Sequence, residues 1–231
     1  MMALFDSHCH VDEPKFDDDR ENVLTRMAEA GVTRYAVIGS DMATSRHSAD
    51  FAAEHPGCYA AIGIHPHEAK GFVEDDLQRL ADWSKEEKVV AIGEIGLDYY
   101  YDLSPRETQM TVCEAQMELA WELSLPVAYH IRDAHQDMLD IMKRHKKHLT
   151  GGIIHCFSGS QSFFQTVQCR RYIAVFCSND GFCFCDDSNQ SSFISDTFQI
   201  GDRSDDISIC LADRLRCTVQ VINDVFCSIH C

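Results

Sequence analysis

The sequence predicts an α/β fold, a parallel (β/α) barrel that is incomplete toward its C-terminus. Two observations carry this prediction. Short apolar runs alternate with amphipathic helical patterns from residue 3 to about residue 168 of the 231-residue chain, and such alternation is typical of parallel strands joined by right-handed crossovers. Polar residues that can do chemistry follow directly after the apolar runs, which favours a barrel because barrels carry such residues at the C-terminal ends of their strands.

The apolar runs predict six strands before residue 160. They are Ala3–His8, Arg34–Gly39, Tyr59–Ile64, Val89–Ile95, Pro126–Ile131 and Gly152–Phe157. An amphipathic helix is predicted to start near Phe16, with Gly31 as its C-terminal cap. Another helix is predicted to begin at Ser104-Pro105-Arg106-Glu107, a sequence that matches a capping box with proline at the first helical position.

The composition of the chain changes abruptly near residue 168. Residues 169–231 contain no Lys and no Glu, and they hold eight of the twelve cysteines. Tyr172–Phe176 and Thr218–Ile222 could each form a strand, but no amphipathic helix is predicted between them, and a full barrel needs ~250 residues. We therefore predict a partial barrel domain over 1–168 and an atypical Cys/Ser-rich tail over 169–231. A divergent cap, a disordered extension or a frame-shifted translation would each produce such a tail, and we favour the last.

The charge and composition limit the function classes. A net charge of −17 argues against broad electrostatic binding of nucleic acid, although bound dications would reverse the local potential and still allow a phosphate substrate. The sequence shows no secretory signal pattern and no apolar run near the ~18 residues of a membrane span. We therefore expect no membrane partner and a cytoplasmic location, with a nuclear location as the alternative. In a reducing compartment the cysteines are not expected to form a disulfide framework.

Three of the predicted strands end in residues that can bind a metal ion or a substrate. His8 and His10 lie two residues apart at the end of the first strand, so both imidazoles point to one face. Glu94 follows the apolar run Val89–Ile92 near the end of the fourth predicted strand and is flanked by Gly93 and Gly96. A carboxylate in such a buried strand is destabilising unless it is paired or bound to a cation. His65 follows the third run. Each motif alone is weak, because a structural role explains a single histidine or glutamate at least as well.

The fifth and sixth strands add His130 and His155 at their ends. The complete set carries the argument, because barrel closure would bring all these strand ends to one mouth. Imidazole nitrogens with a carboxylate suit Zn²⁺, Mn²⁺ or Fe²⁺, whereas Mg²⁺ alone prefers more oxygen ligands. The sequence therefore predicts a metal centre. Its candidate residues are His8, His10, His65, Glu94, His130 and His155.

Five motifs, in order along residues 3–159, resemble the TatD-like deoxyribonucleases. The resemblance implies a TIM barrel of the metal-dependent hydrolase superfamily and hydrolysis of ester bonds, most often DNA phosphodiesters. It therefore implies a 3′–5′ exonuclease-type deoxyribonuclease with DNA or another phosphodiester as its substrate. The motifs are DSHCH at Asp6–His10, GIHPH at Gly63–His67, GEIGLD at Gly93–Asp98, HIRDA at His130–Ala134 and HCFSG at His155–Gly159.

The same resemblance implies a role for each candidate residue. His8 and His10 would be ligands of one divalent ion, His130 and His155 would be ligands of a second, and Glu94 would bridge the two. Glu94, His65 and Arg132 would be the catalytic residues, with His65 and Arg132 lining the phosphate-binding mouth. The two ions, Mg²⁺, Mn²⁺ or Zn²⁺, would activate a water molecule and steady the attacking and leaving oxygens.

One departure from the family bears on activity. The family closes its first metal site with an aspartate in an E-T-D-type segment. The tail has no such segment, and its Asp196 and Asp213 stand in different settings. An inactive, truncated family member is therefore one alternative function. A small-molecule amidohydrolase or lactonase is another, but such enzymes often use a carboxylated lysine as the bridge. Glu94 in the bridging position favours the nuclease.

Overall fold

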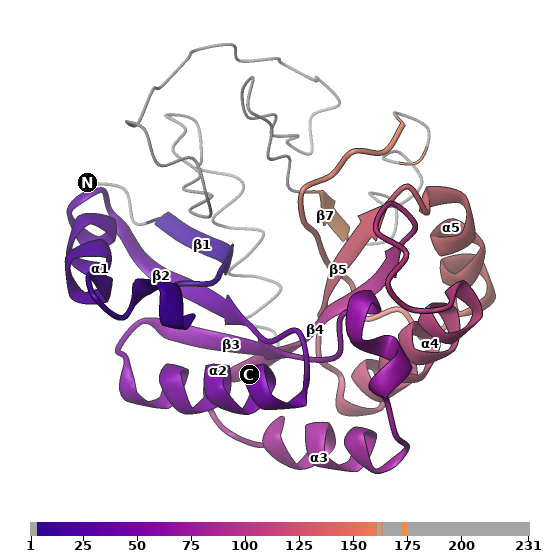
Figure 1. Ribbon diagram of the computed structural model, residues 1–231, viewed down its shortest axis with the longest axis horizontal. Coiled ribbons are helices and arrows are strands. Elements are labelled where there is room, and N and C mark those ends of the chain that lie inside the picture. The colour runs from indigo at the N-terminus through magenta and orange to yellow at the C-terminus, as the bar shows by residue number, and fades with distance from the viewer. Residues whose placement is uncertain (1–3, 161–162, 164–171, 175–231) are drawn as a thin grey trace.

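The computed structural model describes residues 4–160, residue 163 and residues 172–174. Within them, one parallel sheet runs in chain order, each strand pairing with the next. Its seven strands are β1 (Leu4–Cys9), β2 (Val32–Ile38), β3 (Cys58–Ile62), β4 (Val89–Asp98), β5 (Val127–Arg132), β6 (Gly152–Ile154) and β7 (Tyr172–Ala174). The sheet curls between β1 and β7 (Figure 1). This arrangement confirms the predicted partial barrel.

The α-helices lie between consecutive strands and on the outer side of the curled sheet (Figure 1). None of the described helices is long and apolar enough to cross a membrane. The α-helices are α1 (Arg20–Glu29), α2 (Met42–Glu54), α3 (Asp75–Trp83), α4 (Arg106–Leu123) and α5 (His135–Arg144), and the 3-10 helices are η1 (Pro14–Phe16) and η2 (Pro66–Gly71).

The core lies mainly between the helices and the sheet. Every residue of β4 is buried, as expected for a parallel strand that is covered on both faces. Leu80 of α3 and Met138 of α5 are fully buried in the same cluster as Ile92 of β4. A second, smaller cluster includes Ala36 and Ala61, on the opposite face of the sheet. These contacts fix the strand ends, and with them the residues that follow.

Two helix boundaries differ from the predictions. The helix predicted from near Phe16 starts at Arg20, after the short η1, and Gly31 follows its end with a φ of +91° as predicted for a cap. No capping box starts α4, because Pro105 is the N-cap residue and makes no side-chain cap bond. The hydroxyl of Ser104 is used elsewhere: it donates to the carbonyl of His67 at 2.8 Å. Ser104 therefore joins η2 to the start of α4.

Little of the predicted tail lies within the described residues. Tyr172–Ala174, inside the predicted strand Tyr172–Phe176, forms β7 and pairs with β6. The predicted strand Thr218–Ile222, Asp196 and Asp213 lie outside the described residues. The proposed division at residue 168 and the frame-shift explanation stay predictions.

Candidate metal centre

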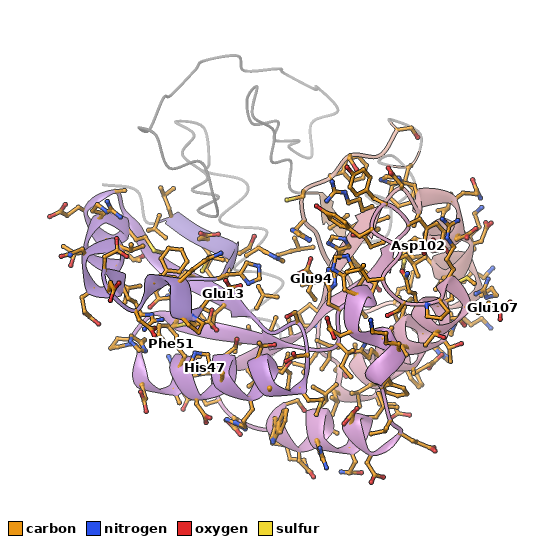
Figure 2. The ribbon with its side chains drawn as sticks, viewed as in Figure 1. Glu13, His47, Phe51, Glu94, Asp102 and Glu107 are labelled. Atoms are coloured by element: carbon orange, nitrogen blue, oxygen red, sulfur yellow. The ribbon has the colours of Figure 1, made fainter. Side chains whose placement is uncertain are left out.

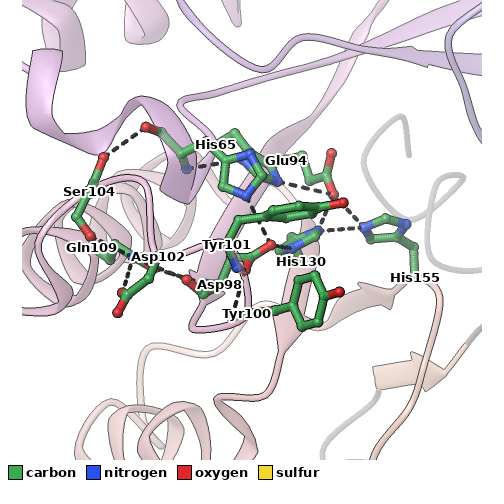
Figure 3. A network of polar contacts seen from close by, with 11 residues as sticks. His65, Glu94, Asp98, Tyr100, Tyr101, Asp102, Ser104, Gln109, His130 and His155 are labelled. Carbon is green, nitrogen blue, oxygen red and sulfur yellow. Dashed lines mark hydrogen bonds and ion pairs between the residues drawn. The ribbon is translucent and has the colours of Figure 1, made fainter.

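Glu94 is the centre of a cluster of imidazoles at the C-terminal ends of the strands. Its Oε1 contacts Nε2 of His155 and lies 2.9 Å from Nδ1 of His130. Nε2 of His65 lies 3.8 Å from the same oxygen, and Nε2 of His8 lies 3.7 Å from Oε2. Figure 3 shows His65, His130 and His155 around the glutamate. In Figure 2 Glu94 lies near the middle of the molecule, whereas Glu107 lies at its outer edge.

The cluster contains two groups of three residues that could each hold a metal ion. One group is His8, His10 and Glu94, and the other is His65, Glu94 and His130. Within each group the ligand atoms lie within 4.8 Å of one another. Ligand bonds of about 2.0–2.2 Å span nearly this distance across one ion. Because Glu94 belongs to both groups, its carboxylate stands where a bridging ligand is needed.

The burial of Glu94 makes its charge depend on these neighbours. Its side chain is 6% exposed. Burial alone would raise the pKa of Glu94, but the surrounding imidazoles, with His155 and His8 foremost, outweigh burial and hold that pKa well below its usual range. The carboxylate is therefore ionised at neutral pH and available to a cation.

Two histidines beside Glu94, His8 and His65, are suited to bind a cation rather than a proton. Burial lowers the pKa of His8 well below its usual value and lowers the pKa of His65 to about 3. Neutral imidazoles offer the lone pair that a metal ion requires. Both ring nitrogens of His8 are buried and have no hydrogen-bond partner within the described part of the chain. Such orphaned nitrogens are destabilising unless something binds them, and a metal ion would satisfy one.

His155 and His65 both reach the carboxylate of Glu94. His155 stacks on His8 with ring centroids 3.8 Å apart, and its Nε2 lies 3.3 Å from Nδ1 of His130. The resemblance assigned His155 to the second metal and His65 to the phosphate-binding mouth. The geometry brings both histidines to Glu94. Which of them binds the metal ion and which binds phosphate stays a prediction. His10 lies farther out, with Nδ1 3.6 Å from Oε1 of Glu13.

Asp98 has no counterpart among the predicted site residues. It ends β4, it is fully buried, and its Oδ2 accepts hydrogen bonds from Nε2 of His130 and Nε2 of His67, both at 2.9 Å. Burial would raise the pKa of Asp98, but the amide of Tyr101 and these two imidazoles lower it. Asp98 therefore orients His130, so that Nδ1 faces Glu94, an arrangement typical of histidine ligands in metal sites. The sequence signal was the same as for Glu94: a carboxylate at the end of a buried strand.

The same contacts set the protonation of His130. Burial would lower the pKa of His130, but the carboxylates of Glu94 and Asp98 outweigh burial and raise that pKa. In the absence of a metal ion, a proton on each ring nitrogen satisfies both carboxylates. His67, the second missed residue, shares Asp98 with His130.

Arg132 lies beside exposed aromatic rings at the rim of the cluster. The guanidinium carbon lies 4.0 Å from the ring centroid of Tyr100 and 4.8 Å from that of Tyr101. The two tyrosines are 59% and 53% exposed, and Figure 3 shows them next to His130 and Asp98. Asp98 accepts hydrogen bonds from both of their backbone amides, at 3.0 and 2.8 Å. One buried carboxylate thus connects the centre with its aromatic rim.

Glycines next to Glu94 allow β4 and β5 to approach closely. Gly96 has a φ of +145°, and a Cβ there would lie 1.9 Å from the carbonyl oxygen of His130. Gly93, at φ +149°, would bring a Cβ within 2.6 Å of the carbonyl of Ala128. Side chains at either position would push apart the two strands that carry Glu94 and His130.

Comparison with known proteins connects this geometry to a family. The uncharacterized metal-dependent hydrolase YabD of Bacillus subtilis is 43% identical over 157 residues, which cover 68% of this chain and 62% of that protein. The 3'-5' ssDNA/RNA exonuclease TatD of Cronobacter sakazakii is 35% identical over 158 residues, covering 68% of this chain and 60% of the relative. The chain thus spans less than two thirds of the length of these relatives.

Solved structures and a family model agree with these relatives. YjjV, a TatD homolog from Escherichia coli, has a TM-score of 0.69 and 34% identity over 74% of this chain and 66% of that chain. A TatD family hydrolase from Entamoeba histolytica shares the fold, with a TM-score of 0.67 and 22% identity over 75% of this chain and 65% of that one. The family model described as TatD related DNase matches residues 5–191. The resemblance drawn from the five motifs is therefore confirmed, and the chain belongs to the TatD-related DNase family.

Proposed function

We propose that the chain is a metal-dependent phosphodiesterase that removes nucleotides from the 3′ end of single-stranded DNA, with two divalent ions (Mg²⁺, Mn²⁺ or Zn²⁺) as cofactors. The observation that carries the proposal is the position of Glu94, common to two groups of potential ligands. Two ions held by one bridging carboxylate are the arrangement that phosphoryl-transfer enzymes use. The relative from Cronobacter sakazakii, whose name specifies single-stranded DNA and RNA, supports the substrate class.

Each residue of the centre has a role in this proposal. His8 and His10 would hold one ion, His130 and His155 the other, and Glu94 both. When bound, the ions supply a water molecule of lowered pKa and charge stabilisation for the attacking and leaving oxygens. Asp98 would keep the ring of His130 in place.

Arg132 at the rim and His65 inside the cluster would bind the substrate rather than the ions. Arg132 and His65 would donate hydrogen bonds to phosphate oxygens, and a guanidinium can do so with two parallel bonds. Tyr100 and Tyr101 are exposed beside Arg132, and exposed aromatic rings stack well on unpaired bases. This rim favours single-stranded over double-stranded substrate, because paired bases do not present their faces.

Substitution of Glu94 tests the proposal. Glu94→Gln keeps the size of the side chain and removes its charge, so degradation of a 5′-labelled single-stranded oligonucleotide with Mn²⁺ should fall at least about 100-fold, as expected for loss of a group that holds the reacting centre. Glu107→Gln is the matched control, because Glu107 is exposed on α4 and lies far from the cluster. The control should degrade the oligonucleotide at the rate of the unaltered chain.

Two results would overturn the proposal. One is a Glu94→Gln protein that degrades the oligonucleotide at the unaltered rate, which would show that the activity arises elsewhere. The other is an unaltered chain that binds two Mn²⁺ ions yet leaves the DNA intact, which would mean that the centre hydrolyses a different ester.

A further inference from the structure

A second group of metal-binding side chains lies away from the candidate metal centre. It consists of Glu118 on α4, His145 directly after α5 and His148 in the segment before β6. This segment leads into the N-terminal ends of the strands, whereas Glu94 and its histidines stand at the C-terminal ends. The ligand atoms of the three residues lie within 4.8 Å of one another. The group is therefore separate from the cluster around Glu94.

Both imidazoles direct Nδ1 at the same carboxylate. Nδ1 of His145 lies 2.7 Å from Oε1 of Glu118. Nδ1 of His148 lies 2.9 Å from Oε2 and 3.1 Å from Oε1 of the same residue. Two imidazole nitrogens and a carboxylate that converge in this way make a donor set typical of Zn²⁺ and related transition-metal ions.

A second carboxylate faces the other side of His145. Nε2 of His145 lies 2.9 Å from Oε2 of Glu114, and Glu114 is itself paired with Arg144. A neutral imidazole has one N–H, so it cannot donate to Glu114 and Glu118 together. A cation bound to Nδ1 and Glu118 would leave the N–H on Nε2 for Glu114 and so satisfy both carboxylates. A metal-bound histidine that donates its other N–H to a carboxylate is the usual arrangement in metal sites.

The surroundings hold these ligands in place yet leave them open to solvent. The indole of Trp121 stacks on the ring of His148, with centroids 4.0 Å apart and planes 15° apart. The side chains of Glu118 and His148 are 37% and 39% exposed, and that of His145 is 16% exposed. An ion here can therefore exchange with solvent and keep a water molecule as a fourth ligand.

We propose that Glu118, His145 and His148 bind one transition-metal dication of the Zn²⁺ class, with Glu114 as the residue that orients His145. The site joins α4 to the end of α5. It does not depend on the proposed nuclease function, because it shares no residue with the centre around Glu94. Lys146 and Lys147 lie close by, and their exposed charges weaken the binding without occupying the ligand atoms.

Zinc content tests the proposal on the full chain. Protein stripped with a chelator, then dialysed against Zn²⁺, should lose one zinc ion per chain in Glu118→Gln and in His148→Ala relative to the unaltered chain. Glu122→Gln is the matched control. Glu122 is exposed one turn further along α4, and its substitution removes the same charge without removing a proposed ligand. An equal zinc content in all four proteins would overturn the proposal, and so would an equal loss in the control.

A second measurement needs no variant and so does not depend on how variants fold. Diethyl pyrocarbonate modifies accessible imidazoles, and peptide mapping measures the rate at each histidine. Zn²⁺ should slow the modification of His145 and His148 at least about tenfold, while exposed lysines on the same peptides keep their rates. Equal rates with and without Zn²⁺ at these two histidines would show that the cluster is an ion-pair network only.

Discussion

Two buried carboxylates on β4 differ in what surrounds them. Glu94 faces imidazoles, and the ring nitrogens of one of them, His8, have no hydrogen-bond partner among the described residues. Asp98 is satisfied by protein donors: two imidazoles and the backbone amides of Tyr100 and Tyr101. Because Asp98 accepts from backbone amides as well as from imidazoles, it serves to orient other groups, whereas Glu94 faces imidazoles that can share its carboxylate with a cation.

Asp98→Asn should weaken metal binding although Asp98 is not itself a proposed ligand. The amide can still accept one hydrogen bond, but it carries no charge and its NH₂ group opposes the imidazole N–H groups that now face Asp98. Loss of such an orienting carboxylate typically lowers metal affinity about 10–100-fold, which calorimetric titration with Mn²⁺ would measure.

Asp102→Asn provides the matched control for that substitution. Asp102 is exposed, pairs with Arg106, and has a φ of +53° that asparagine adopts readily. The control should bind Mn²⁺ as the unaltered chain does. Unchanged affinity in Asp98→Asn would show that His130 needs no orienting carboxylate.

His135, outside the metal centre, makes the free energy of unfolding depend on pH. Its ring packs against Phe163, with centroids 5.2 Å apart, and burial lowers the pKa of His135 despite the nearby carboxylate of Asp133. In the unfolded chain the imidazole of His135 has its ordinary pKa of about 6.5, so it binds a proton more tightly than in the folded chain. The contribution to stability is therefore full above pH ~6.5 and is lost as the pH falls toward the lower folded pKa.

The variant His135→Gln should remove this part of the pH dependence. Urea unfolding of metal-free protein at pH 7.5 and pH 5 gives two free energies of unfolding, and their difference should be smaller in the variant than in the unaltered chain. An identical difference in both proteins would mean that His135 titrates equally in the folded and unfolded states.

At the scale of elements, Gly96 sets how closely β4 approaches β5. The variant Gly96→Ala places a methyl group at a φ of +145° and against the carbonyl of His130. Backbone strain alone should lower the free energy of unfolding by roughly 1–3 kcal/mol, and the clash adds to it. Gly71→Ala is the matched control, since a Cβ at Gly71 meets nothing within 4 Å, and it should change stability little. Urea denaturation that ranks the two variants equally would contradict this explanation.

The elements show how far local sequence carries a prediction. All six strands predicted before residue 160 exist, because each apolar run is the buried part of a parallel strand. The fourth was predicted to stop at Ile95, but β4 continues to Asp98, since tertiary donors satisfy a carboxylate that resembles a loop residue. The capping box predicted at Ser104 was wrong for the same reason, because the partner of this hydroxyl, the carbonyl of His67, lies 37 residues away. The candidate ligands were predictable from motifs, whereas the role of Asp98 depends on contacts between strands.

At the scale of the whole molecule, the candidate metal centre links β1 to strands with which it does not pair. His8 belongs to β1, Glu94 to β4 and His130 to β5, and within the described residues β1 pairs only with β2. An ion held by His8, His10 and Glu94 would therefore tie the first strand directly to the middle of the sheet. Metal binding at this centre should stabilise the curled sheet as a whole rather than one loop.

Removal of metal should for this reason lower the melting temperature of the full chain. At a free Mn²⁺ concentration 100 times the dissociation constant, binding stabilises the folded state by about 2.7 kcal/mol, which corresponds to roughly 5–11 °C for a protein of this size. The double variant His8→Ala/His10→Ala should lose most of this increase, because it removes the ligands on β1. His148→Ala should keep it, since that residue belongs to the other cluster. Calorimetry with and without a chelator measures all three proteins, and an increase of equal size in the double variant would show that β1 takes no part in metal binding.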